Sequence, residues 1–289
     1  EKTAVVACDR TLTYKELNKE ANAIAHSLIE KGIGKGNIVA FMLPRRSYLI
    51  SAITGILKSG AAYLPIDPDY PQERIDYMLS DSNAAFCITE KNIPELLNNS
   101  ENRNPDTDVK STDLCYCIYT SGSTGAPKGT LINHNNIVNF YVDDTINEFQ
   151  HFVAQNCRNI LCCGTVSFDI ATTEIMLSLF FNKTIVLADE AALSGGKQLA
   201  DIINLNKVDC VLSTPTKLYT FLLNDNVFSA FSHVKCVLVA GEQLKADVIE
   251  KINKCGDISL FNGYGPTETT MGVSFGEIKN NIITIGKPI

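Results

Sequence analysis

Short apolar runs alternate with segments of helical periodicity along most of the chain, and this alternation limits the possible folds more than any other feature. Runs such as residues 38–43 and 62–66 are apolar throughout, which is typical of strands that are buried on both faces. Strands that alternate with helices predict a parallel sheet, because each connection crosses over a sheet face. The sequence therefore predicts an α/β fold whose sheet is mostly parallel and covered by helices.

One polar stretch interrupts this pattern. Residues 92–113 end in NNSENRNPDTDVKSTD, which has almost no apolar side chains. Such a composition cannot bury much surface, so we expect an exposed and mobile connection. The chain would then form two α/β lobes within residues 1–289, the first over 1–111 and the second over 112–289.

Composition excludes several functional classes. The 289 residues are 45% hydrophobic, which is enough for a large core, and 25 Lys and Arg against 32 Asp and Glu give a net charge of −7. An acidic chain without basic runs argues against nucleic acid, and no apolar run long enough for a membrane span is present. The ten cysteines lie mostly in apolar runs without C-x-x-C spacing, which favours reduced, buried thiols in a cytoplasmic protein.

The run IYTSGSTGAPKGT at residues 118–130 predicts a phosphate-binding loop. Glycines allow backbone N–H groups to converge on an anion, and hydroxyls and a lysine add further donors. The candidate phosphate ligands are Thr120, Ser121, Gly122, Ser123, Thr124, Gly125 and Lys128. The ordinary P-loop pattern fails, because Pro127 precedes the lysine and Gly129 follows it. A flexible Ser/Gly linker is the alternative, although a linker needs neither the Pro-Lys pair nor the apolar run before it.

A second candidate site is FNGYGPTETT at residues 261–270, directly after a predicted strand. Gly263 and Gly265 would let the backbone approach a flat ligand, and Tyr264 offers a stacking face. Thr267 adds a hydroxyl, and Glu268 adds a carboxylate suited to Mg²⁺. The alternative is a Gly-Pro turn in which Thr267 caps a helix.

Two weaker signals lie at predicted strand or helix ends. Asp169 opens an apolar helical run, where an aspartate is often only an N-cap. Gly241 and Glu242 follow a predicted strand, where they could form an ordinary turn.

Five of these segments together resemble a known family. In order they are LTYKELN (12–18), LKSGAAYLPIDPDYP (57–71), YTSGSTGAPKGT (119–130), FDIATTE (168–174) and NGYGPTET (262–269). They resemble the core motifs of the adenylation domains of nonribosomal peptide synthetases, within the adenylate-forming superfamily of ligases. The resemblance implies an N-terminal core of two stacked, mostly parallel sheets flanked by helices, with the ATP and amino acid sites in the second lobe.

The resemblance also implies an activity. Family members form an aminoacyl-AMP from an amino acid and Mg-ATP, and then transfer the acyl group to the phosphopantetheine thiol of a peptidyl carrier domain. By that resemblance, Thr267 would contact the α-phosphate, Glu268 would bind Mg²⁺, and Lys128 with its loop would hold the β- and γ-phosphates. The adenine site would comprise Gly241, Glu242, Asn262, Gly263, Tyr264 and Gly265. The partners would be the carrier domain and neighbouring synthetase domains, with antibiotic or other secondary metabolites as products.

The resemblance assigns Asp169 to the ammonium group of an amino acid substrate. An acyl- or aryl-CoA ligase of the same superfamily is the alternative, and it would leave this carboxylate without a cation. The matching pocket positions are Asp169, Ile170, Thr173, Leu212, Leu238, Ala240, Gly263, Met271 and Gly272. Since the walls are apolar and two glycines would leave room at the floor, we expect a medium-to-large apolar or aromatic substrate.

The resemblance covers only the large N-terminal part of the family domain. Its C-terminal lobe carries a catalytic lysine that has no counterpart in the printed residues, and Lys287 does not match that position. We therefore expect this chain to bind its ligands with little or no turnover.

Overall fold

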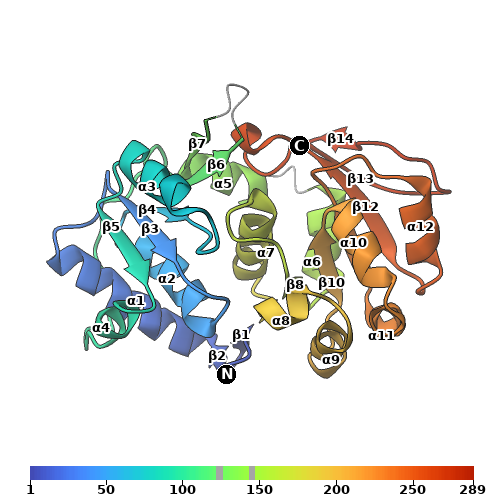
Figure 1. Ribbon diagram of the computed structural model, residues 1–289, viewed down its shortest axis with the longest axis horizontal. Coiled ribbons are helices and arrows are strands. Elements are labelled where there is room, and N and C mark those ends of the chain that lie inside the picture. Colours follow the sequence, from blue (N-terminus) through green and yellow to red (C-terminus); the bar gives the residue numbers. More distant parts are fainter. Residues whose placement is uncertain (122–125, 143–146) are drawn as a thin grey trace.

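The computed structural model describes residues 1–121, 126–142 and 147–289, which form two sheets in side-by-side lobes (Figure 1). The smaller sheet has the order β5-β3-β4-β6-β7, and β7 alone in it is antiparallel. Its strands are β3 (Ile38–Met42), β4 (Ala62–Pro65), β5 (Phe86–Thr89), β6 (Leu114–Thr120) and β7 (Lys128–Asn133). The parallel centre agrees with the alternation in the sequence.

The larger sheet has the order β14-β13-β12-β11-β10-β8-β9-β1-β2. Its central strands run parallel, and β2, β13 and β14 pair antiparallel towards the two edges. The strands are β1 (Thr3–Val6), β2 (Thr11–Thr13), β8 (Asn159–Cys162), β9 (Thr184–Leu187), β10 (Cys210–Ser213), β11 (Cys236–Val239), β12 (Ser259–Tyr264), β13 (Ser274–Glu277) and β14 (Lys287–Pro288).

Helices cover both faces of both sheets, as the fold class predicts. They are α1 (Tyr14–Glu30), α2 (Ser47–Lys58), α3 (Gln72–Asp81), α4 (Ile93–Leu97), α5 (His134–Val142), α6 (Glu148–Asn156), α7 (Asp169–Phe180), α8 (Glu190–Leu193), α9 (Lys197–Leu205), α10 (Pro215–Leu222), α11 (Asp225–Ala230) and α12 (Ala246–Asn253). One continuous core joins the facing sides of the sheets through α1, α2, α5, α6 and α7. A second core packs α9 to α12 on the outer face of the larger sheet, and α3 covers the outer face of the smaller one.

The expected lobe boundary at residues 111–112 does not match the sheets. Strands β6 and β7 lie beyond that boundary but complete the smaller sheet, so the hairpin around the phosphate loop belongs to the first lobe. Strands β1 and β2 lie before it but join the larger sheet, where Val5 pairs with Ile185. The chain thus crosses between the lobes more than once. Each of these strands satisfies its backbone N–H and C=O groups by pairing with the sheet that it joins.

The polar connection is exposed over much of its length, but it is not loose. Its start folds into α4, and the later residues hydrogen-bond to α1 and to the turn after it. Asn22 donates to the carbonyl of Asn102 over 2.6 Å, and Lys35 pairs with Asp113 at 2.9 Å. These contacts tie the exposed connection to the first lobe at several points, which the polar composition did not indicate.

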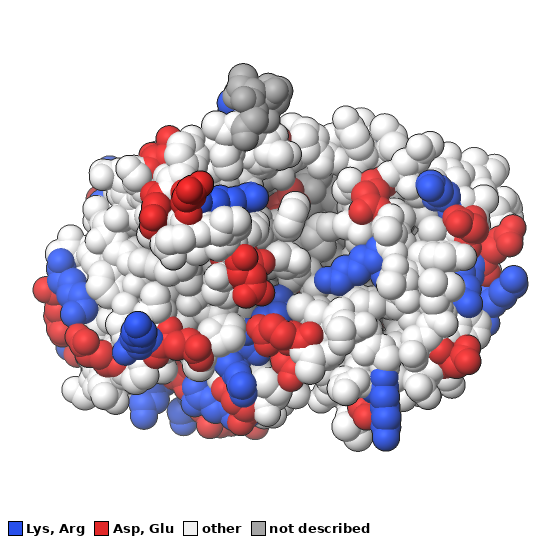
Figure 2. All heavy atoms as spheres, in the orientation of Figure 1, with Lys and Arg blue, Asp and Glu red and all other residues white. Residues whose placement is uncertain are grey.

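The surface in Figure 2 shows acidic and basic side chains intermixed over both lobes, in keeping with the modest net charge. Within the described part of the chain, no helix is both long and apolar enough to cross a membrane.

Arg45 connects the two sheets through the core. It follows β3 of the smaller sheet, and its buried guanidinium donates to the carbonyls of Cys162, Gly164 and Ala188, which lie after or at the ends of β8 and β9. The donor–acceptor distance to Gly164 is 2.7 Å. A buried guanidinium is tolerated only when its donors are satisfied, so these carbonyls fix the relative position of the sheets.

We predict that Arg45→Ala lowers the free energy of unfolding by about 3 kcal/mol or more, because three buried carbonyls lose their donor. Urea unfolding followed by circular dichroism measures the change. Arg103→Ala is the control: Arg103 is exposed and pairs locally with Glu101, so its loss should cost under about 0.5 kcal/mol. Equal effects of the two substitutions would contradict the role given to Arg45.

Candidate active site

The carboxyl ends of β10, β11 and β12 meet at one edge of the larger sheet, where ligands of parallel sheets usually bind. A cavity of about 590 Å³ opens there. Its lining includes all six residues expected at an adenine site: Gly241, Glu242, Asn262, Gly263, Tyr264 and Gly265. The volume is within the range of ordinary small-molecule sites.

The backbone at this cavity has the conformations that its glycines permit. Gly241 has φ +83°, a left-handed conformation that most side chains avoid. A Cβ at Gly265 would lie 2.4 Å from the Cα of Gly272, so only glycine fits there. The carboxylate of Glu242 accepts from the backbone N–H of Thr216 over 3.1 Å, and this interaction with Thr216 holds the pKa of Glu242 below its usual value.

The other side of the cavity comes from a segment that the sequence did not indicate. Ile283, Thr284 and Ile285 line it, and the side chain of Asn262 donates to the carbonyl of Thr284 over 2.8 Å. These residues lie in an irregular stretch before β14 and carry no motif. Their position depends on the antiparallel pairing of β13 with β12, which local sequence does not specify.

A second, much smaller cavity lies beside the first. Six of the nine expected pocket residues line it, namely Ile170, Thr173, Leu212, Leu238, Ala240 and Met271. Ser213 and Phe275 line it as well and were missed by the sequence. The cavity holds about 20 Å³, which is room for roughly one water molecule.

Phe275 explains why this cavity is so small. A Cβ at Gly263 would come within 2.9 Å of the Phe275 ring, and one at Gly272 within 2.5 Å. The two glycines therefore make room for this aromatic ring and not for a substrate. The expectation of free space at the floor was wrong, since β13 places Phe275 opposite Gly263.

Asp169 lies next in sequence to Ile170 of the smaller cavity, although it lines neither cavity itself. It is the first residue of α7, and its carboxylate accepts a 2.8 Å hydrogen bond from the hydroxyl of Thr267, in the turn η2 (Thr267–Thr269). Burial raises the pKa of Asp169, the Thr267 hydrogen bond opposes that shift, and the nearby Glu268 carboxylate raises it further. Asp169, the expected contact of the substrate ammonium, is thus adjacent to Thr267, the expected contact of the α-phosphate.

The phosphate loop connects β6 to β7, and Thr120 pairs with Lys128 across the hairpin. Ser121 and Lys128 are exposed, while Gly122, Ser123, Thr124 and Gly125 lie outside the described residues. Strand β7 packs against η2, which brings the hairpin close to Thr267 and Glu268. The structure therefore places the base of the loop near the α7–η2 junction.

A family model described as AMP-binding enzyme matches residues 1–289. The chain belongs to this family. It is 32% identical over 307 residues to tyrocidine synthase 3 of Brevibacillus parabrevis, an alignment that covers all of this chain and 5% of that protein. The chain thus spans a small part of this curated relative.

Solved structures agree with this membership. A four-domain nonribosomal peptide synthetase, holo-AB3403 bound to AMP and glycine, matches all of the chain and 22% of its own length, with 28% identity and a TM-score of 0.83. The N-terminal subdomain of Klebsiella oxytoca NpsA in complex with anthranilyl-AMSN matches all of the chain and 77% of its own length, with a TM-score of 0.87 and 22% identity. The chain corresponds to the N-terminal core of a nonribosomal peptide synthetase adenylation domain.

Glu268, which the family resemblance implies as the magnesium ligand, lies in the turn η2 next to Thr267. Its carboxylate is exposed at the crevice, and within the described residues it forms no ion pair. Its charge acts on Asp169, so the two carboxylates lie close together. Free carboxylate oxygens near a phosphate site fit the oxygen preference of Mg²⁺.

We predict that Thr267→Val raises the pKa of Asp169 further, because the hydrogen bond that favours the ionised form is lost. Titration of the Asp169 carboxyl carbon by nuclear magnetic resonance measures this pKa. Thr267→Ser keeps the hydroxyl and should leave the pKa nearly unchanged. A lower pKa in Thr267→Val would contradict the hydrogen bond.

Proposed function

We propose that this chain binds Mg-ATP and an apolar amino acid and takes part in forming the aminoacyl-adenylate. The observation that carries the proposal is the Asp169 carboxylate, which is bonded to Thr267 and directly precedes Ile170, a residue that lines the apolar cavity. A carboxylate close to an apolar pocket would suit a ligand with one positive group and an apolar side chain.

ATP would lie along the crevice between the lobes. Its adenine would enter the 590 Å³ cavity, with Tyr264 available for stacking because its side chain is 54% exposed. The phosphates would extend towards the β6–β7 hairpin, where Lys128 and the loop hydroxyls supply donors. This orientation places the α-phosphate near Thr267, the residue that contacts Asp169.

The reaction would be an in-line displacement at the α-phosphorus. The carboxylate oxygen of the amino acid forms a new P–O bond, and the bond to the pyrophosphate oxygen breaks. A Mg²⁺ held by Glu268 would supply charge neutralisation on the phosphates. Thr267 would orient the α-phosphate, and Asp169 would hold the ammonium so that the substrate carboxylate faces the phosphorus.

An acyl- or aryl-CoA ligase remains the second candidate, and Asp169 argues against it. Among the described residues, Thr267 is the side chain that hydrogen-bonds to this carboxylate, and no ion pair with a basic side chain is found. A substrate without an ammonium group would bury this charge further without compensation.

The small cavity leads us to revise the expected substrate. With Phe275 at the floor, a short apolar side chain fits, whereas the medium-to-large one expected from the two glycines would have to displace this ring. Thr173 cannot donate to a substrate hydroxyl in this arrangement, because its own hydroxyl donates to the carbonyl of Asp169 over 2.9 Å.

The similarity to synthetases also suggests the next step. In the full-length protein we propose that the acyl group passes to the phosphopantetheine thiol of a carrier domain, as the family resemblance implies. The carrier thiol would attack the mixed anhydride carbon, and AMP would leave. Neighbouring synthetase domains would then be the partners of this chain.

We predict that Lys128→Ala weakens ATP binding about tenfold or more and leaves amino acid binding unchanged, since one phosphate-facing charge is lost. Asp169→Asn should weaken amino acid binding and leave ATP binding unchanged. Isothermal titration calorimetry measures both ligands, and Lys19→Ala, an exposed lysine on α1, is the control.

The pH dependence of amino acid binding tests the proposed contact between Asp169 and the substrate ammonium. Because burial raises the pKa of Asp169, its carboxyl protonates at higher pH than an ordinary aspartate. Amino acid affinity should therefore fall as the pH falls towards that pKa, and Asp169→Asn should lack this dependence. If an amine-free carboxylic acid binds better than the amino acid, the amino acid assignment is wrong and the ligase alternative is favoured.

We further predict that Phe275→Leu shifts preference from alanine or valine towards leucine or phenylalanine by about tenfold or more, because the floor of the cavity opens. Pyrophosphate exchange by the full-length protein measures the ratio. Phe152→Leu is the control, since this ring packs against Phe261 at 5.8 Å and does not line the cavity. The same shift in both variants would refute the role of Phe275.

A further inference from the structure

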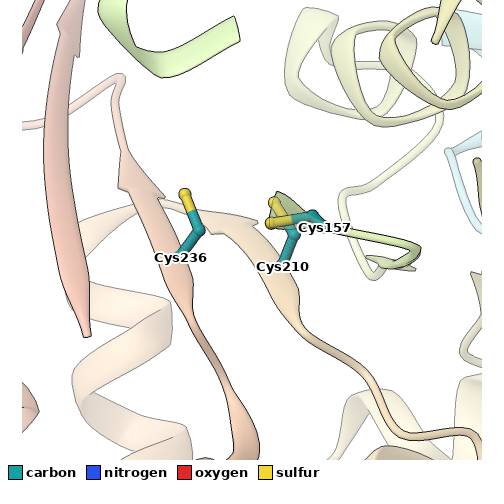
Figure 3. A group of neighbouring side chains, drawn as sticks. All are labelled: Cys157, Cys210 and Cys236. Carbon is teal, nitrogen blue, oxygen red and sulfur yellow. The ribbon is translucent and has the colours of Figure 1, made fainter. Parts of the chain in front are cut away.

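Three buried cysteines converge at the amino ends of central strands of the larger sheet (Figure 3). The candidate active site lies at the opposite, carboxyl ends of these strands. Cys210 and Cys236 are the first residues of β10 and β11, and Cys157 lies between α6 and β8. Their sulfur atoms all lie within 4.8 Å of one another, and each residue is at most 1% exposed. The AMP-binding site at the carboxyl ends of the strands makes no use of them.

The backbone holds the three sulfur atoms together. Cys210 and Cys236 are register partners in adjacent parallel strands, so their side chains stand side by side on one face of the sheet. Cys157 ends α6 and donates its backbone N–H to the carbonyl of Val153 over 3.1 Å. The three sulfur atoms are therefore already within 4.8 Å of one another in the folded chain.

Two lysine side chains lie close to the end of α6, beside the cluster. Lys183 and Lys235 donate to the carbonyls of Ala154 and Asn156 at the end of α6, over 2.6 and 2.9 Å. The ammonium group of Lys235 also lies 3.9 Å from the Asp209 carboxylate. That carboxylate is held by the backbone N–H groups of Arg158 and Asn159.

We propose that Cys157, Cys210 and Cys236 form a three-sulfur binding site for Cu(I). Magnesium and calcium prefer oxygen ligands, and structural zinc almost always takes four ligands. Among the described residues, no fourth His, Cys, Asp or Glu joins this group. Three thiol ligands select a soft cation, and Cu(I) is the soft ion among the thiolate-binding metals.

Charge and access are consistent with this ion. Three thiolates around one Cu(I) carry two net negative charges. The thiol protons leave to solvent as the Cu–S bonds form. Lys183 and Lys235 offset that charge. A solvent-open hollow of about 680 Å³ lies beside the cluster, and its lining includes Arg158, Asp209 and Lys235, the direct sequence neighbours of the three cysteines. An ion would have a short path from this hollow.

The test is competition for Cu(I) against a chromophoric Cu(I) chelator, under anaerobic reducing conditions. The protein carries Cys8→Ser throughout, because Cys8 is the exposed cysteine. We expect one Cu(I) per chain, and at least a hundredfold weaker binding in Cys210→Ala and in Cys236→Ala. Cys117→Ala is the matched control, since this cysteine is equally buried but lies in the smaller sheet.

Two further measurements separate a lost ligand from a lost fold. Circular dichroism should show that the cysteine variants remain folded, and X-ray absorption of the Cu(I)-loaded protein should show three sulfur neighbours. Unchanged affinity in Cys210→Ala, or equal losses in Cys117→Ala, would overturn the site. Uptake of Zn²⁺ in preference to Cu(I), or a disulfide between Cys210 and Cys236 in place of metal uptake, would overturn the choice of ion.

Discussion

The buried guanidinium of Arg45 is the interaction on which the arrangement of the two lobes depends. Its donors reach the carbonyls of Cys162, Gly164 and Ala188, so a residue of one sheet satisfies the strand ends of the other. Arg45 and these carbonyls are buried, and a displacement of the sheets would leave the guanidinium and the carbonyls of Gly164 and Ala188 without these hydrogen bonds. The relative position of the two lobes is consequently fixed at Arg45.

Glu174 extends this constraint to the active site. It is fully buried in α7, and its carboxylate accepts from the backbone N–H groups of Cys163 and Gly164 over 3.2 and 3.0 Å. Burial raises the pKa of Glu174, and the charge of Arg45 opposes that shift. Gly164 is pressed against α7, since a Cβ there would lie 2.9 Å from the backbone N of Ala171. The start of α7, and with it Asp169, is therefore held against β8.

Packing then determines what the site can accept. The Phe275 ring stacks on Phe149 of α6 at a centroid distance of 6.2 Å and meets Phe140 edge-on at 5.8 Å. A ring held on two sides by other rings does not move aside easily. In the proposed reaction, polar residues at strand and helix ends would supply the chemistry, and the aromatic cluster behind them would limit the size of the substrate.

The sequence by itself determined the fold class, the parallel centre of both sheets and most residues of the two cavities. The fold class depends on local periodicity, which a chain carries wherever it folds, whereas the cavity residues were implied by the resemblance of short motifs to a known family. Tertiary structure alone decided that β1 and β2 join the far sheet, that Phe275 fills the space beside Gly263 and Gly272, and that three cysteines meet. Each of these outcomes depends on residues distant in sequence that come together through strand pairing, and no local pattern specifies which strand pairs with which.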